Sequence, residues 1–143
     1  MNDSGSILLL RDDEHACVQA DLGRSIFSLT WKGSVPSDAW RRILVQAHMQ
    51  VRQHMLRSWI SDSRQLSGIL PGDEAWIMTD FTPRMVVTGL ERMALVMVND
   101  RSRRTALGRL VDQAAPVAPF PIRFFNEPEQ AVRWIADMER SLA

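Results

Sequence analysis

One stretch of the chain restricts the fold more than any other. It consists of six consecutive apolar residues, Met93 to Val98, between polar pairs. The run is too short to cross a membrane, which takes about 20 apolar residues. A strand with one buried face would alternate apolar and polar side chains, and this run does not alternate, so both of its faces must be covered. The run therefore predicts a central strand of a sheet that is covered by helices.

Three short runs with strand character precede the first expected helix. They are Ile7 to Arg11, Ala16 to Asp21 and Ser25 to Trp31, and in the last of them large apolar side chains alternate with small hydroxyl side chains. This alternation is typical of a strand with one buried face. The separating segments, 12–15 and 21–24, are polar, and the second contains a glycine that can adopt a positive φ. We therefore expect an antiparallel meander at the N-terminus.

Helical periodicity follows the meander. From Ser37 to Leu56 apolar residues recur at helical spacing from Trp40 through Met55, and Ser37 is the candidate N-cap. The later segments with helical patterns are Asp73 to Ile77, Thr82 to Gly89, Ala106 to Ala114 and Asn126 to the C-terminus, and those with strand patterns are Ser58 to Ser61 and Ile122 to Phe125.

Strands and helices thus alternate along most of the chain. This order predicts an α/β fold with a mixed, largely parallel sheet of about five or six strands, covered by helices. No repeat, linker or low-complexity segment interrupts it, so we expect a single domain over residues 1–143.

Composition excludes several classes of protein. Lys and Arg together number 17, as do Asp and Glu, so no net field attracts the chain to nucleic acid or to an anionic membrane. Residues 1–6 have neither the basic start nor the apolar core of a signal peptide, and no run has the length of a transmembrane segment. Cys17 is the single cysteine, which excludes a disulfide framework. We expect a cytoplasmic protein that is either a monomer or a homodimer.

Landmark residues at the ends of the expected strands and in the following helices are spaced as in a known family. They are Trp31, Gly33, Asp62, Trp76, Phe125, Asn126, Ala131 and Trp134. From about Ser25 onward the chain resembles the STAS domains, which have the anti-sigma-factor antagonist fold, and in particular their uncharacterised bacterial relatives near the CRAL-TRIO lipid-binding fold. The resemblance implies a STAS-like fold and a function that depends on binding.

In the signalling members of this family, a partner kinase phosphorylates a serine in an Asp-Ser-Ser-Gly-like turn between a strand and a helix. The nearest segments here are Asp62-Ser63-Arg64-Gln65 and Leu66-Ser67-Gly68, and only the first two letters of the former match the family's turn. The resemblance leaves Ser63 and Ser67 as alternatives for the corresponding serine. Asp62 is expected at the carboxyl edge of the sheet, where ligands of open α/β sheets bind.

No pattern of catalytic or metal-binding residues stands out. Cys17 and His15 flank an acidic turn that offers nothing to activate a thiolate. His48 and His54 are six residues apart, which separates them by about 240° around a helix. The carboxylates within 73–80 suit the first turns of helices. Glycine-rich nucleotide motifs and the hydrolase Gly-x-Ser-x-Gly are absent, so we expect no enzyme activity, no metal and no cofactor.

Two features favour a binding function. Arg101, Arg103 and Arg104 come at the start of an expected helix, where positive charge opposes the helix dipole. They form either an anion site with the free N–H groups of that helix or a solvated turn. The chain also contains five tryptophans and eight methionines, which belong mostly to a core but also line apolar ligand pockets.

The sequence therefore predicts a non-enzymatic regulatory or binding domain that acts through a protein partner or through a small apolar or anionic ligand. The alternatives are a CRAL-TRIO-like carrier of an apolar, lipid-like ligand and an enzyme whose site a single sequence does not reveal. The residues expected to bind the ligand or partner are Asp62, Ser63, Arg64, Trp76, Arg101, Arg103 and Arg104.

Overall fold

The computed structural model describes residues 6–66, 70–97 and 106–141, and a six-stranded sheet forms its centre. The strands are β1 (Ile7–Asp12), β2 (Ala16–Asp21), β3 (Ile26–Trp31), β4 (Ser58–Asp62), β5 (Arg92–Val96) and β6 (Ile122–Phe125). The helical elements are α1 (Ser37–Gln53), α2 (Pro71–Trp76), the π-helix η2 (Ile77–Phe81), α3 (Thr82–Val86), α4 (Ala106–Ala114) and α5 (Pro128–Ser141).

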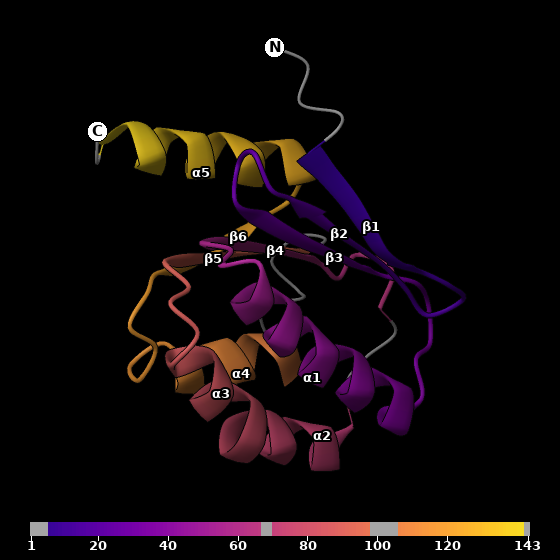
Figure 1. Cartoon of the computed structure of the whole chain (residues 1–143). Helices are drawn as coiled ribbons and strands as arrows, with labels where there is room; N and C mark the ends of the chain where they lie inside the picture. The colour runs from indigo at the N-terminus through magenta and orange to yellow at the C-terminus, as the bar shows by residue number, and fades with distance from the viewer. Residues whose placement is uncertain (1–5, 67–69, 98–105, 142–143) are drawn as a thin grey trace.

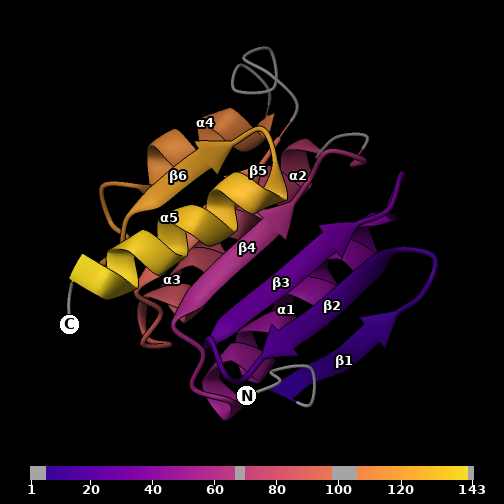
Figure 2. The ribbon, with the colours of Figure 1, turned by 90° about the horizontal axis from the view of Figure 1, so that it is seen from above.

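The strands lie in the sheet in the order of the sequence. The first three pair antiparallel, and β3 to β6 pair parallel. Helices α1 to α4 cover one face of the sheet and α5 lies on the other (Figure 1). Figure 2 shows that α5 crosses β4 to β6 and leaves β1 to β3 without a helix on that face. The predicted α/β class, with an N-terminal meander and a largely parallel remainder, is confirmed.

The two turns of the meander form where the polar segments predict them. In the first turn the Asp13 carboxylate accepts hydrogen bonds from the backbone N–H groups of His15 and Ala16 at 2.9 and 3.0 Å. In the second turn the positive φ occurs at Ser25, at 60°, and not at Gly23. Tertiary contacts explain the difference, because both the Ser25 hydroxyl and its carbonyl accept the N–H of Arg57 at the start of β4.

The apolar stripe of α1 packs on the sheet as its spacing predicts, but both ends of the helix differ from the prediction. Ser37 does not cap the helix, because its hydroxyl binds the Asp73 carboxylate at 2.6 Å. The helix ends at Gln53, before the predicted end at Leu56. Met55 has a φ of 51° and is 81% exposed, since the left-handed residue turns the chain away from the helix axis.

The segment from α2 through η2 to α3 forms one continuous helical stretch, whereas the sequence pattern predicted two separate helices. Pro83 lies at the junction of η2 and α3, and it has no N–H to donate to the carbonyl four residues earlier. The helix accommodates the proline with a wider turn, in which the N–H of Thr82 bonds to the carbonyl of Ile77. Gly89, with a φ of 87°, follows this stretch.

Each face of the sheet has its own apolar cluster. Phe27, Leu29 and Trp31 of β3 belong to the cluster under α1 and the other helices of that layer, as the alternation in this strand predicts. The cluster under α5 consists of Ile26, Ile60, Ala94, Val96, Ala131 and Ile135. An ion pair also attaches α5 to the sheet, because the buried Arg92 donates to Ser58 at 2.8 Å and to Glu139 at 2.9 Å.

The predicted central strand corresponds to β5, which lies between β4 and β6 and has helices on both faces. Its residues Leu95 and Val96 are buried, which agrees with a strand covered on both sides. The strand begins one residue before the apolar run and ends at Val96, and the last residue of the run, Val98, lies outside the described residues. None of the described helices is long and apolar enough to span a bilayer.

We expect that Val96→Asp unfolds the protein or lowers its free energy of unfolding by at least about 4 kcal/mol. The side chain of Val96 is fully buried in the cluster under α5, where the substitution would leave an unpaired charge. Urea unfolding followed by circular dichroism measures the change, with the exposed-site variant Val117→Asp as the control. A Val96→Asp protein as stable as this control would contradict the assignment of β5 as a buried strand.

Candidate functional site

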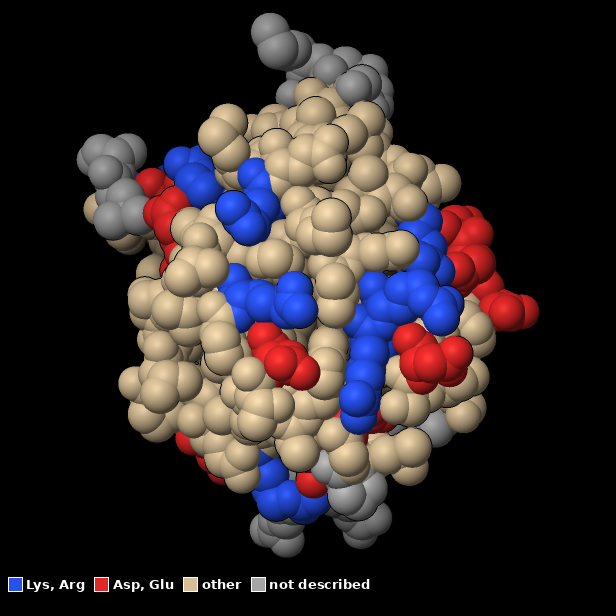
Figure 3. Space-filling view, turned by 60° about the horizontal axis from the view of Figure 1, so that its bottom comes forward, with Lys and Arg blue, Asp and Glu red and all other residues tan. Residues whose placement is uncertain are grey.

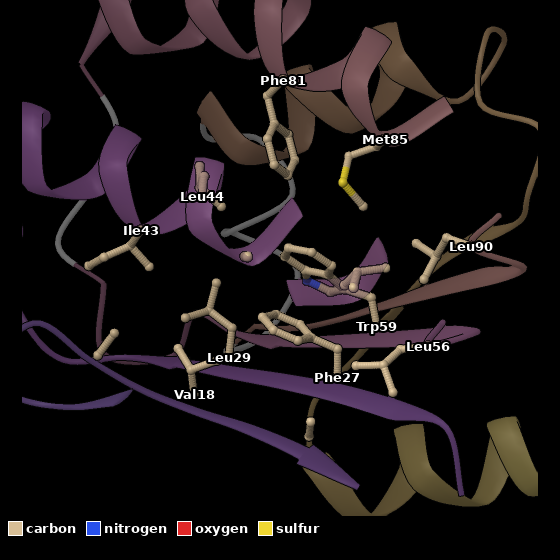
Figure 4. Close-up of a cluster of buried hydrophobic side chains, with 14 of the residues drawn as sticks. Val18, Phe27, Leu29, Ile43, Leu44, Leu56, Trp59, Phe81, Met85 and Leu90 are labelled. Carbon is tan, nitrogen blue, oxygen red and sulfur yellow. The ribbon is translucent and has the colours of Figure 1, made fainter. Parts of the chain in front are cut away.

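An apolar cavity of about 110 Å³ lies between the sheet and the helices α1 to α4. Strands β3 to β6 form its floor, and α1, η2, α3 and α4 form its walls. Figure 4 shows Phe81 and Met85 pointing from the helical layer toward the sheet, where Trp59 and Phe27 lie. The aromatic residues in its lining are Trp31, Trp40, Trp59, Phe81 and Phe120.

A continuous series of aromatic contacts supports this cavity. The Trp31 ring stacks on Trp40 with 6.1 Å between ring centroids, and Trp59 meets the edge of Phe81 at 6.0 Å. Trp76 joins the two pairs, because it contacts Trp40 at 6.1 Å and Phe81 at 6.2 Å. Such pairs prefer defined offset or edge geometries, so the series holds α1 and η2 at a set distance from the sheet.

The polar groups of the cavity come mainly from one strand and the residue after it. Side chains alternate between the two faces of a strand, so Trp59, Ser61 and Ser63 point to the cavity side, and Ile60 and Asp62 point to the α5 side. Thr82 provides the only other hydroxyl among the lining residues that are described, and none of those residues is ionisable. The cavity can therefore hold a neutral apolar group better than a charged one.

Two buried residues of the lining, Ser61 and Trp40, carry a polar group without a hydrogen-bond partner within the described structure. Ser61 is only 7% exposed, and none of the described residues hydrogen-bonds to its hydroxyl. The Nε1 of Trp40 is buried and likewise has no partner there. The Trp40 Nε1 is closed off from solvent, whereas the Ser61 hydroxyl is not among the closed-off atoms without a partner and can be reached from the cavity.

The predicted residues Asp62, Ser63 and Arg64 form a turn at the carboxyl edge of the sheet. The Asp62 carboxylate accepts from the backbone N–H of Arg64 at 3.1 Å and from its guanidinium at 2.9 and 3.0 Å. The backbone N–H of Ser63 bonds to the carbonyl of Val96 at the end of β5 at 2.9 Å. Asp62 thus lies at the edge where the order of the short strands placed it, in a turn that two strands and an ion pair hold in position.

The same turn extends toward α5. Arg64 also contacts Glu127, just before α5, at 3.2 Å, and the hydrogen bond to Asp62 raises the pKa of Arg64 above its ordinary value. Because two carboxylates already engage the guanidinium, it is not a free site for an anion. Asp62 and Arg64 therefore belong to the α5 side, and Ser63 is the member of the predicted set that lines the cavity.

Trp76 supports the site from outside. It is not part of the cavity lining but packs behind Trp40 and Phe81, and the guanidinium of Arg41 lies 5.5 Å from its ring centroid. Arg101, Arg103, Arg104 and Ser67 lie outside the described residues, so the predicted anion site and the alternative serine stay predictions.

Sequence reasoning missed most of the lining. Ser61 was expected only as the end of a buried strand, although the pattern Trp59-Ser61-Ser63 at a period of two signals a mixed aromatic and hydroxyl face. The helices α3 and α4 contribute Met85 and Leu110, which the sequence marks only as apolar stripe residues. No local signal could show that these stripes leave a space between them.

Other side-chain groups give no second site. Among the described residues, no three of His, Cys, Asp and Glu come together in a way that could hold a metal ion. Figure 3 shows the face formed by the helices, where basic and acidic side chains lie beside one another. The buried Asp73 receives 2.6 Å hydrogen bonds from both Arg41 and Ser37. On this face the charges are interspersed and do not form a patch of one sign.

Comparison with solved structures identifies the fold. A crystal structure described as an uncharacterised DUF3478-family protein with a SpoIIAA-like fold, from Shewanella loihica PV-4, matches with a TM-score of 0.57. The two sequences are 12% identical, and the match covers 90% of this chain and 91% of that one. Two structures of SiaC from Pseudomonas aeruginosa give TM-scores of 0.49 and 0.47, at 15% and 14% identity, over 83% and 82% of this chain and 98% and 96% of theirs.

The match to the DUF3478-family protein shows a SpoIIAA-like fold, which is the STAS-type fold that the spacing of landmark residues predicted. The matches give no support to the further link with the CRAL-TRIO group. Comparison with protein-family models gives no match, and comparison with curated proteins gives no significant one.

The ion pair of the carboxyl-edge turn gives a prediction about local stability. We expect Asp62→Ala to lower the free energy of unfolding by about 1–3 kcal/mol, because the hydrogen bonds that hold the guanidinium of Arg64 and the turn backbone are lost. Glu127→Ala should cost less than about 1 kcal/mol, because its carboxylate is mostly exposed. Urea unfolding compares the two, and equal losses would show that the turn does not depend on Asp62.

A second prediction concerns pH. His48 is 6% exposed, and burial, followed by the charges of Arg84 and Arg52, lowers the pKa of His48 below 6.5. The folded protein therefore takes up a proton at His48 less readily than the unfolded chain does. The contribution of neutral His48 to the free energy of unfolding is fully present above pH 6.5 and is lost as the pH falls below that value.

We expect His48→Gln to flatten the decline of stability between pH 7.5 and 5.5, where one such group contributes at most about 1.4 kcal/mol per pH unit. Urea unfolding at several pH values measures the slope. The control is His54→Gln, which replaces an imidazole at a half-buried position, and His48→Gln should flatten the slope more than this control does. The same slope in His48→Gln and the parent would assign the effect to other groups.

Proposed function

We propose that this chain is a non-enzymatic binding domain, whose site is the apolar cavity between its sheet and the helical layer. The observation that supports this most directly is the cavity itself, with aromatic walls and a few hydroxyl groups in its lining. Small-molecule sites typically combine apolar walls with a few placed polar groups. General acid or base catalysis needs an ionisable side chain at the reacting group, and none occurs among the described lining residues.

The size of the cavity restricts its occupant. At about 110 Å³ it is comparable to engineered cavities of about 150 Å³ that bind benzene. It is well below the roughly 300 Å³ at which sites for drug-sized ligands begin. Only part of a lipid-like ligand would fit within this volume, so the proposal favours a small apolar molecule over the lipid carrier that the sequence left as an alternative.

A regulatory protein partner is the second candidate, and the position of Ser63 favours it. This residue lines the cavity and also belongs to the turn at the carboxyl edge. In signalling proteins of the STAS type, the resemblance places the modified serine at this edge. A ligand in the cavity would contact the same turn that a partner would meet, so binding and regulation are compatible in one site.

The proposal predicts that filling the cavity abolishes binding. Ala114 lines the cavity from α4, and the neighbouring Ala115 is exposed and does not line it. We expect the parent protein and Ala115→Met to bind benzene, detected as a rise in melting temperature and by calorimetric titration. Ala114→Met should bind it at least about tenfold more weakly, because its side chain occupies the space.

Equal benzene affinity in the two methionine variants would place the binding elsewhere. The absence of any benzene-dependent change in the parent protein would reject the cavity as a site for small apolar molecules. Circular dichroism of both variants tests that each is folded before their affinities are compared.

A further inference from the structure

We infer that the cavity selects a neutral molecule with a single aromatic ring and one hydrogen-bonding oxygen, of the phenol or benzyl alcohol class. This inference rests on the proposed function, since it names the chemical class that the cavity would take. It adds two elements to simple apolar binding, namely an aromatic preference and a defined polar partner.

The preference for a ring follows from the walls. Trp31, Trp40, Trp59, Phe81 and Phe120 surround a volume of about 110 Å³. Aromatic pairs in edge or offset geometry add attraction beyond the apolar area that they bury. The edge contact of Trp59 with Phe81, at 6.0 Å, shows that this wall already uses such geometry. A single ring therefore gains more in this cavity than an alkyl group of equal volume.

The requirement for neutrality follows from the lack of countercharge among the described lining residues. No described residue of the lining is ionisable. The nearby carboxylate of Asp62 lies on the α5 side of the sheet and is already paired with Arg64. A charged ligand would lose its hydration without gaining an ion pair, which is strongly unfavourable. We therefore expect aromatic carboxylates and ammonium compounds to bind much more weakly than neutral rings.

The oxygen of the ligand has a specific partner in Ser61. Ser61 is part of the lining and is 7% exposed as a residue, and its hydroxyl is accessible and has no hydrogen bond to any residue that the structure describes. A serine hydroxyl both donates and accepts, so it can bind a phenolic or alcoholic oxygen in either sense.

The test uses three probes that share one ring: benzene, phenol and benzoate, each titrated calorimetrically at pH 7 into the parent protein, Ser61→Ala and Ser28→Ala. Ser28 is the matched control, because it lies on β3 between Phe27 and Leu29 and therefore faces away from the cavity. Both substitutions remove one hydroxyl from a strand, so any difference between them reports on the cavity.

We expect the parent protein and Ser28→Ala to bind phenol and benzene and to reject benzoate. In Ser61→Ala the affinity for phenol should fall about tenfold, and the affinity for benzene should stay the same or rise slightly, because only the hydrogen-bonding partner is lost. The diagnostic quantity is the ratio of the two affinities within each variant, which cancels any general effect on the fold.

An unchanged phenol to benzene ratio in Ser61→Ala would overturn the assignment of Ser61, and benzoate binding as tight as that of phenol would overturn the requirement for neutrality. In both cases benzene binding would leave the proposed cavity function intact. If neither benzene nor phenol binds the parent protein, the proposed function itself fails, and the inference fails with it.

Discussion

The aromatic contacts between the sheet and the helical layer are the interaction on which the rest of the structure depends. Trp59 on β4 contacts Phe27 at 4.5 Å beside it in the sheet and Phe81 at 6.0 Å above it. Through Phe81 and Trp76 the same contacts reach α1. Large rigid rings pack well against one another but fill a space less completely than flexible side chains. The rings therefore stabilise the layer and also leave a cavity beside them.

The opposite face of the sheet is held together differently. There α5 covers only β4 to β6, over a small apolar cluster, and the buried Arg92 connects it to the sheet through Glu139. A buried cation is costly unless it is paired, so this ion pair constrains where α5 can lie more than it adds net stability. The face without the cavity thus depends on a specific polar contact, and the face with the cavity depends on ring packing.

Strand β4 connects the two faces. Along it, Trp59, Ser61 and the following Ser63 belong to the cavity side, and Ile60 and Asp62 belong to the α5 side. Asp62 and Ser63 are adjacent in sequence and were predicted as one site, yet the alternation of the strand separates their side chains. The paired carboxylate and guanidinium of Asp62 and Arg64 hold the turn, and Ser63 remains in the cavity lining.

The sequence by itself determined the order and type of nearly all elements, because hydrophobic periodicity is a local property. The alternation in β3, the stripe of α1 and the uninterrupted run of β5 each indicate the correct element and the correct buried face. Local rules failed where distant residues compete for the same groups. Ser37 binds Asp73 instead of capping α1, and Ser25 takes the positive φ because the start of β4 bonds to it.

Only the tertiary structure decided where the site lies. The cavity exists because residues far apart in sequence, from Trp31 to Ile122, surround a volume that no single element encloses. The shape of the cavity depends on how far the helical layer lies from the sheet. Ring packing, such as that between Trp59 of β4 and Phe81 of η2, sets this distance, and a periodic sequence pattern does not. The pattern shows which side chains are buried, but whether they fill the space between them is a property of their three-dimensional packing.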